Sequence, residues 1–444
     1  MNKHFSFLPT SFKNYLEKQI IVWRRQFHQY PEPAWCEFKT VSMVAGILKD
    51  FDYHLVLGKD LLSSCERMGL PDEDVLNDFY TRAQNQKDSH SELLQQIKGG
   101  YTAVAGILKN GEGPTVLFRF DMDALPLREL DQANHFPVQQ GFRSTYENYM
   151  HACGHDGHTA IGLGLAFALK ELKERVRGKI ILLFQPAEEG LRGATALVNN
   201  SLFANIDYGF GFHLWADKPV GQLICGTNGQ LASSKFDIFI TGKTAHAGLN
   251  PEDGINAMLP AVEIVLALEE LRKSYNKDIK LNVGILEGGS GRNIICSHAK
   301  LCIETRAINS KLNQKLYTES LAIIKEKVNK YNCKFEIKAM GYADAANCNK
   351  KLAEKIQITA QQIPYFSDIR LIEQAGGNSE DFTVFINHIH ESGGKATYIG
   401  VGASKNAGGH HTSNFDINEK TFIHVVDLLT GICINDSHGA NFLL

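Results

Sequence analysis

Three apolar runs in the first half of the chain predict buried strands, and each run ends in polar side chains. The runs are residues 115–121, 179–185 and 208–212. Short apolar runs bounded by turn residues are typical of strands that are covered on both faces. Polar residues that follow the carboxyl ends of strands in an α/β sheet converge on one crevice, so we expect those that follow these runs to meet there. They are Asp121, Asp123, Glu188, Glu189 and His213.

Helical periodicity alternates with these runs and completes an α/β pattern. Residues 12–30 repeat apolar positions every three or four residues, as an amphipathic helix does, and Pro31 ends the pattern. An apolar helix is expected to start at or near Asp156 and to run to Leu169. Further helices are expected at residues 40–48, 350–363 and 419–434, and a buried strand at residues 396–401.

The pattern changes after about Gln230, where alternating strands replace the buried runs. Strands at residues 236–241, 281–286, 299–306 and 334–339 are combined with helices at residues 254–271 and 314–331. Strand, helix, strand, strand, helix, strand is the order of a ferredoxin-like α+β unit. We therefore expect residues 231–342 to form a domain inserted into an α/β domain, which it divides into residues 1–230 and 343–444.

A polar, charge-rich stretch at residues 59–99 interrupts the first part of the α/β domain. Helical pieces are expected within it at residues 72–86 and 90–97. One interpretation is a surface insertion, and the alternative is an element that determines specificity or contacts another subunit.

Composition and charge exclude several classes of protein. The 444 residues are 43% hydrophobic and carry a net charge of −3, which gives no electrostatic basis for binding nucleic acid or a membrane surface. No run approaches the roughly 18 apolar residues of a membrane span, and residues 1–7 lack the apolar core of a signal peptide. Nine cysteines without a framework spacing indicate a reduced, cytoplasmic setting.

Metal ligation is the chemistry indicated by the run from His151 to His158, which holds three histidines, one cysteine and one aspartate. Cys153 and His155 stand two residues apart, and in a turn this spacing directs both side chains toward one ion. Such a cluster taken alone is as often structural as ligating. The adjacent Glu188 and Glu189 strengthen the metal hypothesis, because two buried carboxylates repel each other unless a cation lies between them. One carboxylate would then bind the ion, and the other would serve as general base.

Other polar residues of the α/β part are candidate members of the same site. His213 and the pair His410–His411 are candidate ligands, with a core histidine and an exposed pair as the structural alternatives. Asp121 and Asp123 are either ligands or acceptors that orient a ligating histidine.

The inserted domain adds candidates for substrate binding. His246 lies among alanine and glycine, where it has little to pack against, and this position suggests a hydrogen-bond donor that needs close approach to another group. Asn293 and Arg306 are candidates for binding a substrate carboxylate, because arginine pairs with carboxylates in bidentate geometry. An ordinary salt bridge is the alternative for Arg306.

Seven segments resemble the M20 metallopeptidase and aminoacylase family, in the branch of bacterial N-acyl-amino-acid amidohydrolases and plant auxin-conjugate hydrolases. The resemblance covers nearly the whole chain. Residues 67–71 and 150–165 are similar to the members of that branch that use aminobenzoyl-glutamate. The seven segments are residues 24–32, 121–126, 150–156, 185–190, His213, residues 244–247 and residues 376–382.

This resemblance implies a zinc-peptidase-like α/β catalytic domain, an inserted lid and dimerisation domain, and a dinuclear metal site. In the family pattern Cys153 bridges two divalent ions and Glu188 is the base. Asp123 is expected to support the ligands from outside, and His246 to reach the active site of the neighbouring subunit. The remaining ligands implied are His155, Glu189, His213 and His411, the last chosen over His410 by its distance from Phe415.

The function that we expect is hydrolysis of the amide bond between an acyl or aryl group and an amino acid, with p-aminobenzoyl-glutamate as the leading substrate. A broader N-acyl-amino-acid amidohydrolase of the hippurate or auxin-conjugate type is the alternative enzyme. A non-catalytic subunit of a heteromer is the alternative of another class. The metal is either zinc or manganese. A thiolate ligand favours zinc, and the resemblance to the N-acyl-amino-acid amidohydrolase branch favours manganese. The partner stays open between a homodimer and a paralogous subunit.

Overall fold

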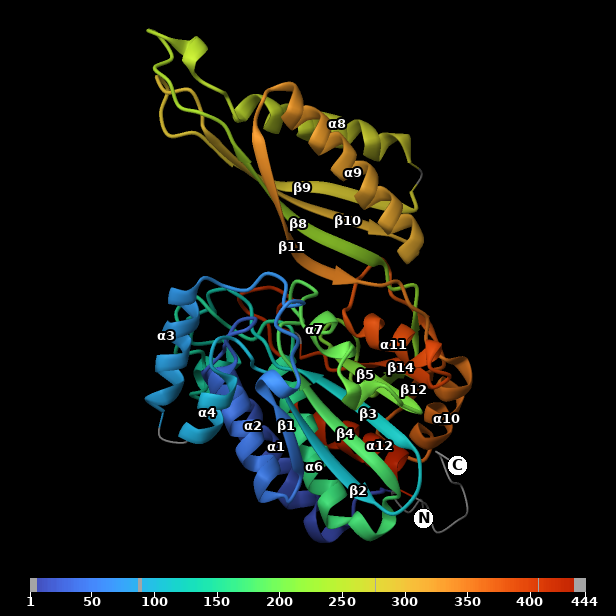
Figure 1. Cartoon of the computed structure of the whole chain (residues 1–444). Coiled ribbons are helices and arrows are strands. Elements are labelled where there is room, and N and C mark those ends of the chain that lie inside the picture. The colour runs from blue at the N-terminus through green and yellow to red at the C-terminus, as the bar shows by residue number, and fades with distance from the viewer. Residues whose placement is uncertain (1–5, 87–89, 276, 406, 435–444) are drawn as a thin grey trace.

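The computed structural model describes residues 6–86, 90–275, 277–405 and 407–434. The prediction that residues 1–7 do not form a signal peptide falls partly on residues 1–5, which lie outside the described residues. The chain forms a large domain and a smaller inserted domain that projects from it, each with its own hydrophobic core (Figure 1). Within the described residues, no helix is long and apolar enough to cross a membrane.

A mixed eight-stranded sheet forms the centre of the large domain, in the order β1-β2-β4-β3-β5-β14-β6-β12. The four central strands β4, β3, β5 and β14 run parallel, and antiparallel pairs join β1 to β2, β2 to β4 and β14 to β6. The strands are β1 (His54–Leu57), β2 (Val104–Asn110), β3 (Thr115–Asp121), β4 (Gly178–Gln185), β5 (Tyr208–Trp215), β6 (Gln222–Ile224), β12 (Asp368–Arg370) and β14 (Lys395–Gly402).

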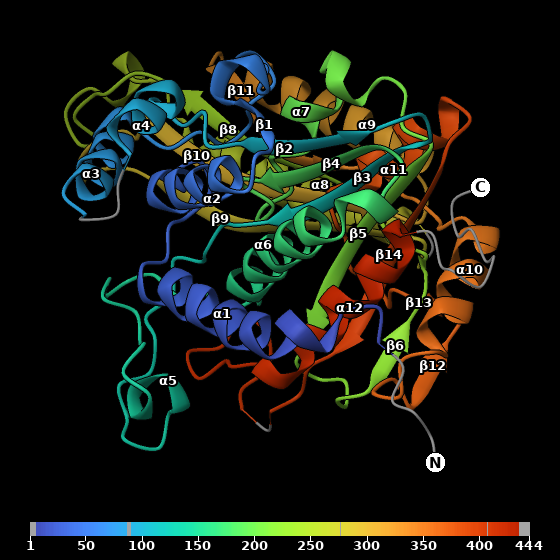
Figure 2. The ribbon, with the colours of Figure 1, turned by 90° about the horizontal axis from the view of Figure 1, so that it is seen from below.

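Helices cover both faces of this sheet. On one face α6 packs against α1 and α12, and the three lie side by side in Figure 2. On the other face α11 packs against β5 and β14, where Gly211 of β5 leaves room for Phe382. The helices of the large domain are α1 (Thr10–Gln29), α2 (Phe38–Asp50), α3 (Glu73–Gln84), α4 (Ser91–Ile97), α5 (Phe136–Gln139), α6 (His155–Glu171), α7 (Thr195–Val198), α10 (Lys350–Ala360), α11 (Phe382–Glu391) and α12 (Phe422–Cys433).

Helix α6 lies very close to the sheet because of its glycines. An added Cβ at Gly162 would come within 2.7 Å of Phe184 and 2.8 Å of Phe120. The residue before the helix, Gly154, has a φ of 93°, a conformation that favours glycine. This close packing fixes the first turn of α6, which carries His155, against the carboxyl ends of the central strands.

The inserted domain is the ferredoxin-like unit that the sequence predicts. Its antiparallel sheet has the order β11-β8-β10-β9, and its two helices pack on this sheet. The proposed boundaries at residues 231 and 342 fall at its first and last strands. Its elements are β8 (Ala232–Thr241), α8 (Met258–Ser274), β9 (Ile279–Gly288), β10 (His298–Ala307), α9 (Ser310–Lys330) and β11 (Lys334–Ala343).

Two helix starts in this domain differ from the expected positions. Helix α8 begins at Met258 rather than residue 254, because the backbone of Ile255 pairs with Lys243 in an isolated bridge and stays extended. Helix α9 begins at Ser310 rather than residue 314, because the side chain of Asn309 accepts a hydrogen bond from the Leu312 N–H and caps the helix.

The stretch at residues 59–99 contributes α3 and α4, which pack against α2 at the edge of the large domain. One face of each helix is buried, so the stretch extends the core of this domain. The buried side chains are Leu76, Phe79, Tyr80, Leu94 and Ile97.

Candidate metal centre

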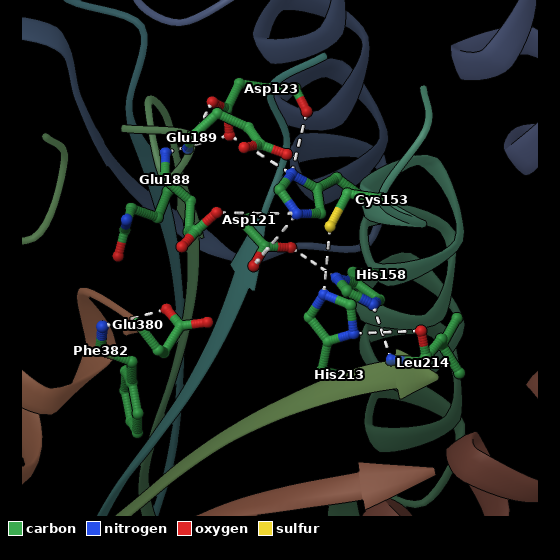
Figure 3. Close-up of polar contacts among 12 residues, drawn as sticks. Asp121, Asp123, Cys153, His158, Glu188, Glu189, His213, Leu214, Glu380 and Phe382 are labelled. Carbon is green, nitrogen blue, oxygen red and sulfur yellow. Dashed lines mark hydrogen bonds and ion pairs between the residues drawn. The ribbon is translucent and has the colours of Figure 1, made fainter. Parts of the chain in front are cut away.

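The polar residues that follow the central strands meet at one edge of the sheet, as the sequence predicts (Figure 3). Asp121 ends β3, and Glu188 and Glu189 lie in the turn after β4. His213 differs from the expectation that it follows its strand. It lies inside β5, because this strand continues in register with β14 to Trp215.

Cys153 occupies the centre of this cluster. Its Sγ lies 3.4 Å from Nε2 of His213 and 3.8 Å from Nδ1 of His410. The same sulfur shares a second group of close donor atoms with Glu189 and His411. Cys153 is therefore the residue that these two groups of potential ligand atoms have in common.

Glu189 and His411 form the second group with Cys153. His411 Nε2 lies 3.3 Å from Glu189 Oε1, and this carboxylate raises the pKa of His411. The backbone N–H of His411 donates to the carbonyl of Ala152, which ties the loop of His411 to the segment of Cys153. Both His410 and His411 therefore lie within reach of Cys153, each in a different group.

The backbone holds His155 with one ring nitrogen free. His155 Nδ1 donates to the carbonyl oxygen of Asp123 at 2.9 Å. Its Nε2 is buried without a hydrogen-bond partner and lies 3.9 Å from both Asp121 Oδ2 and Glu188 Oε2. This nitrogen is available for an ion.

Asp123 positions the two glutamates through their backbone. Its carboxylate oxygens accept the N–H of Glu188 at 3.0 Å and of Glu189 at 2.9 Å. The carbonyl of the same residue orients His155. Asp123 thus contacts the backbone of both glutamates and the ring of His155.

Asp121 and His158 satisfy each other and do not offer a free ligand pair. His158 Nδ1 donates to Asp121 Oδ1 at 2.5 Å, and His158 Nε2 accepts the N–H of Leu214 at 3.0 Å. The other oxygen of Asp121 pairs with the buried Arg119. Both nitrogens of His158 are occupied, so His158 serves to hold β5 beside α6.

The donor set fits divalent cations. Burial raises the pKa of the Glu188 carboxyl well above its usual range, and Glu380 and Glu189 raise it further. Burial also raises the pKa of the Cys153 thiol to about 12, with Glu189 contributing. A divalent cation at this point would reverse both effects, because it stabilises the thiolate and the carboxylates. Two of the buried side-chain atoms without a hydrogen-bond partner, His155 Nε2 and Glu189 Oε1, belong to this cluster, and Glu189 Oε1 lies at ion-pair distance from His411.

A cavity of about 490 Å³ opens beside the cluster and reaches the inserted domain. Several of its lining residues gave no functional signal in the sequence. Trp215 stacks on His213, and Glu380 belongs to residues 376–382, a segment of the family resemblance in which the sequence assigned Glu380 no role. Lys235 gave no local signal, because it precedes the strand predicted at residues 236–241 and a single lysine there is usually solvated. The lining residues that sequence reasoning missed are Trp215, Asp217, Thr227, Gln230, Lys235, Asn378, Ser379, Glu380 and Tyr398.

The candidates of the inserted domain lie in two different places. Arg306 lines the cavity. His246 and Asn293 are exposed, and they lie in the loops after β8 and between β9 and β10, at the end of the inserted domain away from the eight-stranded sheet (Figure 1). These two residues are absent from the described lining of this chain's own cavity.

The profile of peptidase family M20/M25/M40 matches residues 117–435, which include all the cluster residues named above. The chain belongs to this family. It is therefore a metal-dependent hydrolase, and the α/β domain with an inserted ferredoxin-like domain is the fold of the M20 family.

Two curated relatives of the M20 chain match almost its full length. It is 37% identical to a subunit of the p-aminobenzoyl-glutamate hydrolase of Escherichia coli K12, over 96% of this chain and 97% of the relative. It is 38% identical to indole-3-acetyl-aspartic acid hydrolase of Enterobacter agglomerans, over 94% of this chain and 95% of the relative. Among solved structures, an aminobenzoyl-glutamate utilization protein from Klebsiella pneumoniae superposes with a TM-score of 0.82 at 32% identity, covering 95% of this chain and 97% of that one.

Proposed function

We propose that the chain hydrolyses the amide bond of N-acyl or N-aroyl amino acids, with p-aminobenzoyl-glutamate cleaved to p-aminobenzoate and glutamate. The observation that carries this proposal is the cavity, which is lined by the Cys153 cluster from the large domain and by Arg306 from the inserted domain. Ions held by this cluster would supply positive charge to the scissile carbonyl, and the Arg306 guanidinium suits the carboxylate of the amino acid. Both curated relatives are named for amides of an acidic amino acid.

We propose that the chain binds two divalent ions, manganese or zinc, and that Cys153 would be one of the residues that hold them. His155, Glu189, His213 and His411 would complete the ligand set, with His410 as a further donor beside Cys153. When bound, the ions would polarise the substrate carbonyl and lower the pKa of water. The thiolate ligand requires a reduced cysteine, which agrees with the cytoplasmic location predicted from the sequence.

Glu188 is the proposed general base. Its backbone N–H is held by the Asp123 carboxylate, and its own carboxylate lies near His155 without a direct hydrogen bond to it. The residue accepts a proton from the attacking water and passes it to the leaving amine nitrogen, so that the amide bond breaks to a carboxylate and an amine. Glu189, its neighbour, would be bound as a ligand and would be unable to share this task.

We propose that His246 and Asn293 act on the cavity of a partner subunit. His246 Nδ1 accepts the backbone N–H groups of Gly248 and Leu249, both at 3.1 Å. The proton of the neutral ring is therefore on Nε2, which points the residue's donor away from its own loop. Such a donor would stabilise the oxyanion of the neighbouring site, and Asn293 lies in the adjoining loop, bonded through its carbonyl to Ala247.

An apolar surface on the inserted domain supports pairing of two such domains. The side chains of Met258, Val262 and Leu266 recur every four residues along α8 and are 41%, 45% and 62% exposed. Strand β9 lies at the edge of the sheet, with Ile285 and Leu286 exposed. An exposed edge strand beside an apolar helix face is suited to association. A homodimer and a heterodimer with a paralogous subunit both remain proposals.

A substrate panel on the purified, metal-reconstituted chain tests the proposed function. We expect hydrolysis of p-aminobenzoyl-glutamate, with indole-3-acetyl-aspartate as the competing substrate because one relative is named for it. Faster cleavage of neutral acetyl-amino acids would favour the broader amidohydrolase. No cleavage of any member by a metal-loaded chain would contradict the proposal and favour a non-catalytic subunit.

A further inference from the structure

We propose that Lys235 and Arg306 form a two-cation site that selects substrates whose amino acid carries a second carboxylate. Arg306 binds the main-chain carboxylate, and Lys235 binds the side-chain carboxylate of aspartate or glutamate. This inference rests on the proposed amidohydrolase function and assigns Lys235 as a residue that determines its specificity.

Both cations belong to the same wall of the cavity. Lys235 on β8 is paired with Glu304 on β10, and Ser233 with Arg306, in the antiparallel register of these strands. Side chains alternate across a sheet, so Lys235, Glu304 and Arg306 share one face. Among the described lining residues, Lys235 and Arg306 are the two that the inserted domain contributes, and both carry positive charge.

One carboxylate holds the two cationic groups close together. Glu304 Oε1 lies 2.9 Å from Arg306 Nε and 4.0 Å from Lys235 Nζ. The same oxygen also accepts a hydrogen bond from the Ser233 hydroxyl. One shared carboxylate balances only one of the two positive charges, so the wall attracts further anions. The Glu188 and Glu189 carboxylates, which also line the cavity, belong to the proposed metal cluster.

The two side chains suit different carboxylates. The Arg306 guanidinium also donates from Nη1 to the carbonyl of Gly377 at 3.4 Å, which fixes its plane between two domains. A fixed, planar group matches the main-chain carboxylate, which has the same position in every amino acid. Lys235 carries a point charge on a flexible four-carbon chain, which adapts to side chains of different length. One relative is named for an amide of glutamate and the other for an amide of aspartate, and both of these amino acids carry a second carboxylate.

The test compares p-aminobenzoyl-glutamate with p-aminobenzoyl-glutamine, which lacks only the second negative charge. The unaltered enzyme is expected to prefer the glutamate substrate. Lys235→Met should lower kcat/KM for the glutamate substrate by about 10- to 100-fold, mainly through KM, because a charge-assisted contact is lost. For the glutamine substrate the change should stay within about threefold. Arg306→Ala should raise KM for both substrates, since both retain the main-chain carboxylate.

Two control variants isolate the charge of Lys235. Lys300→Met removes a lysine from the same face of β10, where it pairs with Asp237 at 3.2 Å outside the described cavity lining, and should preserve the preference. Lys235→Arg should keep most of the preference. Equal losses of Lys235→Met on both substrates, or an unchanged preference, would overturn the assignment.

Calorimetry with the products separates this inference from the proposed function. Glutamate should bind the metal-loaded enzyme more tightly than glutamine, and Lys235→Met, checked for an unchanged thermal midpoint and metal content, should abolish the difference. If the unaltered chain hydrolyses no acyl amino acid but still binds glutamate through Lys235, the proposed function fails and the two-cation site stands. If hydrolysis occurs and the variant still prefers glutamate, the inference fails alone.

Discussion

At the scale of single residues, backbone groups decide which nitrogen three histidines of the cluster, His155, His213 and His410, offer. His155 and His213 donate from Nδ1 to the carbonyls of Asp123 and Leu214, so both offer Nε2. His410 accepts the Ala216 N–H at Nε2 and offers Nδ1. Burial lowers the pKa of His213 well below its usual value and that of His410 to about 4, which keeps both rings neutral. Neutral rings with one free nitrogen each are the form that binds metal.

Glu188→Gln should abolish most turnover and leave the metal in place. The change removes the base without removing a ligand, so we expect kcat to fall by about 10²- to 10⁴-fold. Turnover and metal content measured on the same preparation check this. A variant with near-normal kcat would remove Glu188 from the role of base.

Cys153→Ser should release metal. A neutral hydroxyl is a much poorer bridging ligand than a thiolate, so the bound metal per chain should fall on dialysis against a weak chelator. Cys65→Ser, which changes an exposed cysteine outside the cluster, is the matched control. Two tightly retained ions per chain in Cys153→Ser would show that the sulfur is dispensable.

At the scale of elements, a buried polar network joins α1 to the first turn of α6. Arg24 and His28 both contact Asp156 Oδ2 at 2.8 Å, and His28 Nε2 lies 2.9 Å from Glu129. All of these side chains are almost completely buried. Removing one partner of such a network leaves an uncompensated charge, so α1 fixes the helix start that carries His155.

This network predicts a stability that declines in alkaline solution. Burial alone would lower the pKa of His28, but Glu129 and Asp156 outweigh burial and raise it to about 9. The raised pKa means that the native state favours the protonated ring. Its stabilisation is therefore complete below about pH 6.5, the pKa of an unfolded histidine, and is lost as the pH rises through about 9.

Urea unfolding of the native chain and of His28→Gln at pH 6, 7.5 and 9 measures this contribution. The difference in unfolding free energy between the two proteins should shrink as the pH rises, because His28 loses its stabilising proton. Other effects of pH on stability are common to both proteins and cancel in this difference. A difference independent of pH would show that His28 contributes through packing and not through its charge.

At the scale of the whole molecule, the two ends of the inserted domain have different roles. The base of its sheet carries Lys235 and Arg306 into the cavity, while the loops with His246 and Asn293 lie at the opposite end (Figure 1). A single chain therefore lacks these two residues at its own described cavity. Completion of the site by a second subunit follows if the domains pair.

Subunit complementation tests this arrangement. His246→Ala and Glu188→Gln should each be inactive, with the loss of one oxyanion donor costing about 10²- to 10³-fold in kcat. After exchange of subunits, a mixed dimer has one site with both defects and one site with neither. The activity of a mixed dimer should therefore return to at most about half of that of the unaltered dimer. Demonstrated exchange without recovered activity would place His246 at its own chain's site or at none.

The elements and a set of candidate metal ligands could be predicted from the sequence. Apolar runs and helical periods are local, so the central strands, α1, α6 and the βαββαβ order of the inserted domain were all predicted. The run from His151 to His158 and the adjacent Glu188 and Glu189 likewise indicate a metal site from neighbouring residues alone.

Which of these residues share space depends on the tertiary structure. The two groups around Cys153, with His410 in one and His411 in the other, arise because a distant loop returns to the start of α6. The placement of Lys235 beside Arg306 depends on the register of β8 against β10 and on how that sheet faces the cavity. Contacts of this kind join residues far apart in the chain, and no local pattern of hydrophobic and polar positions encodes their distance.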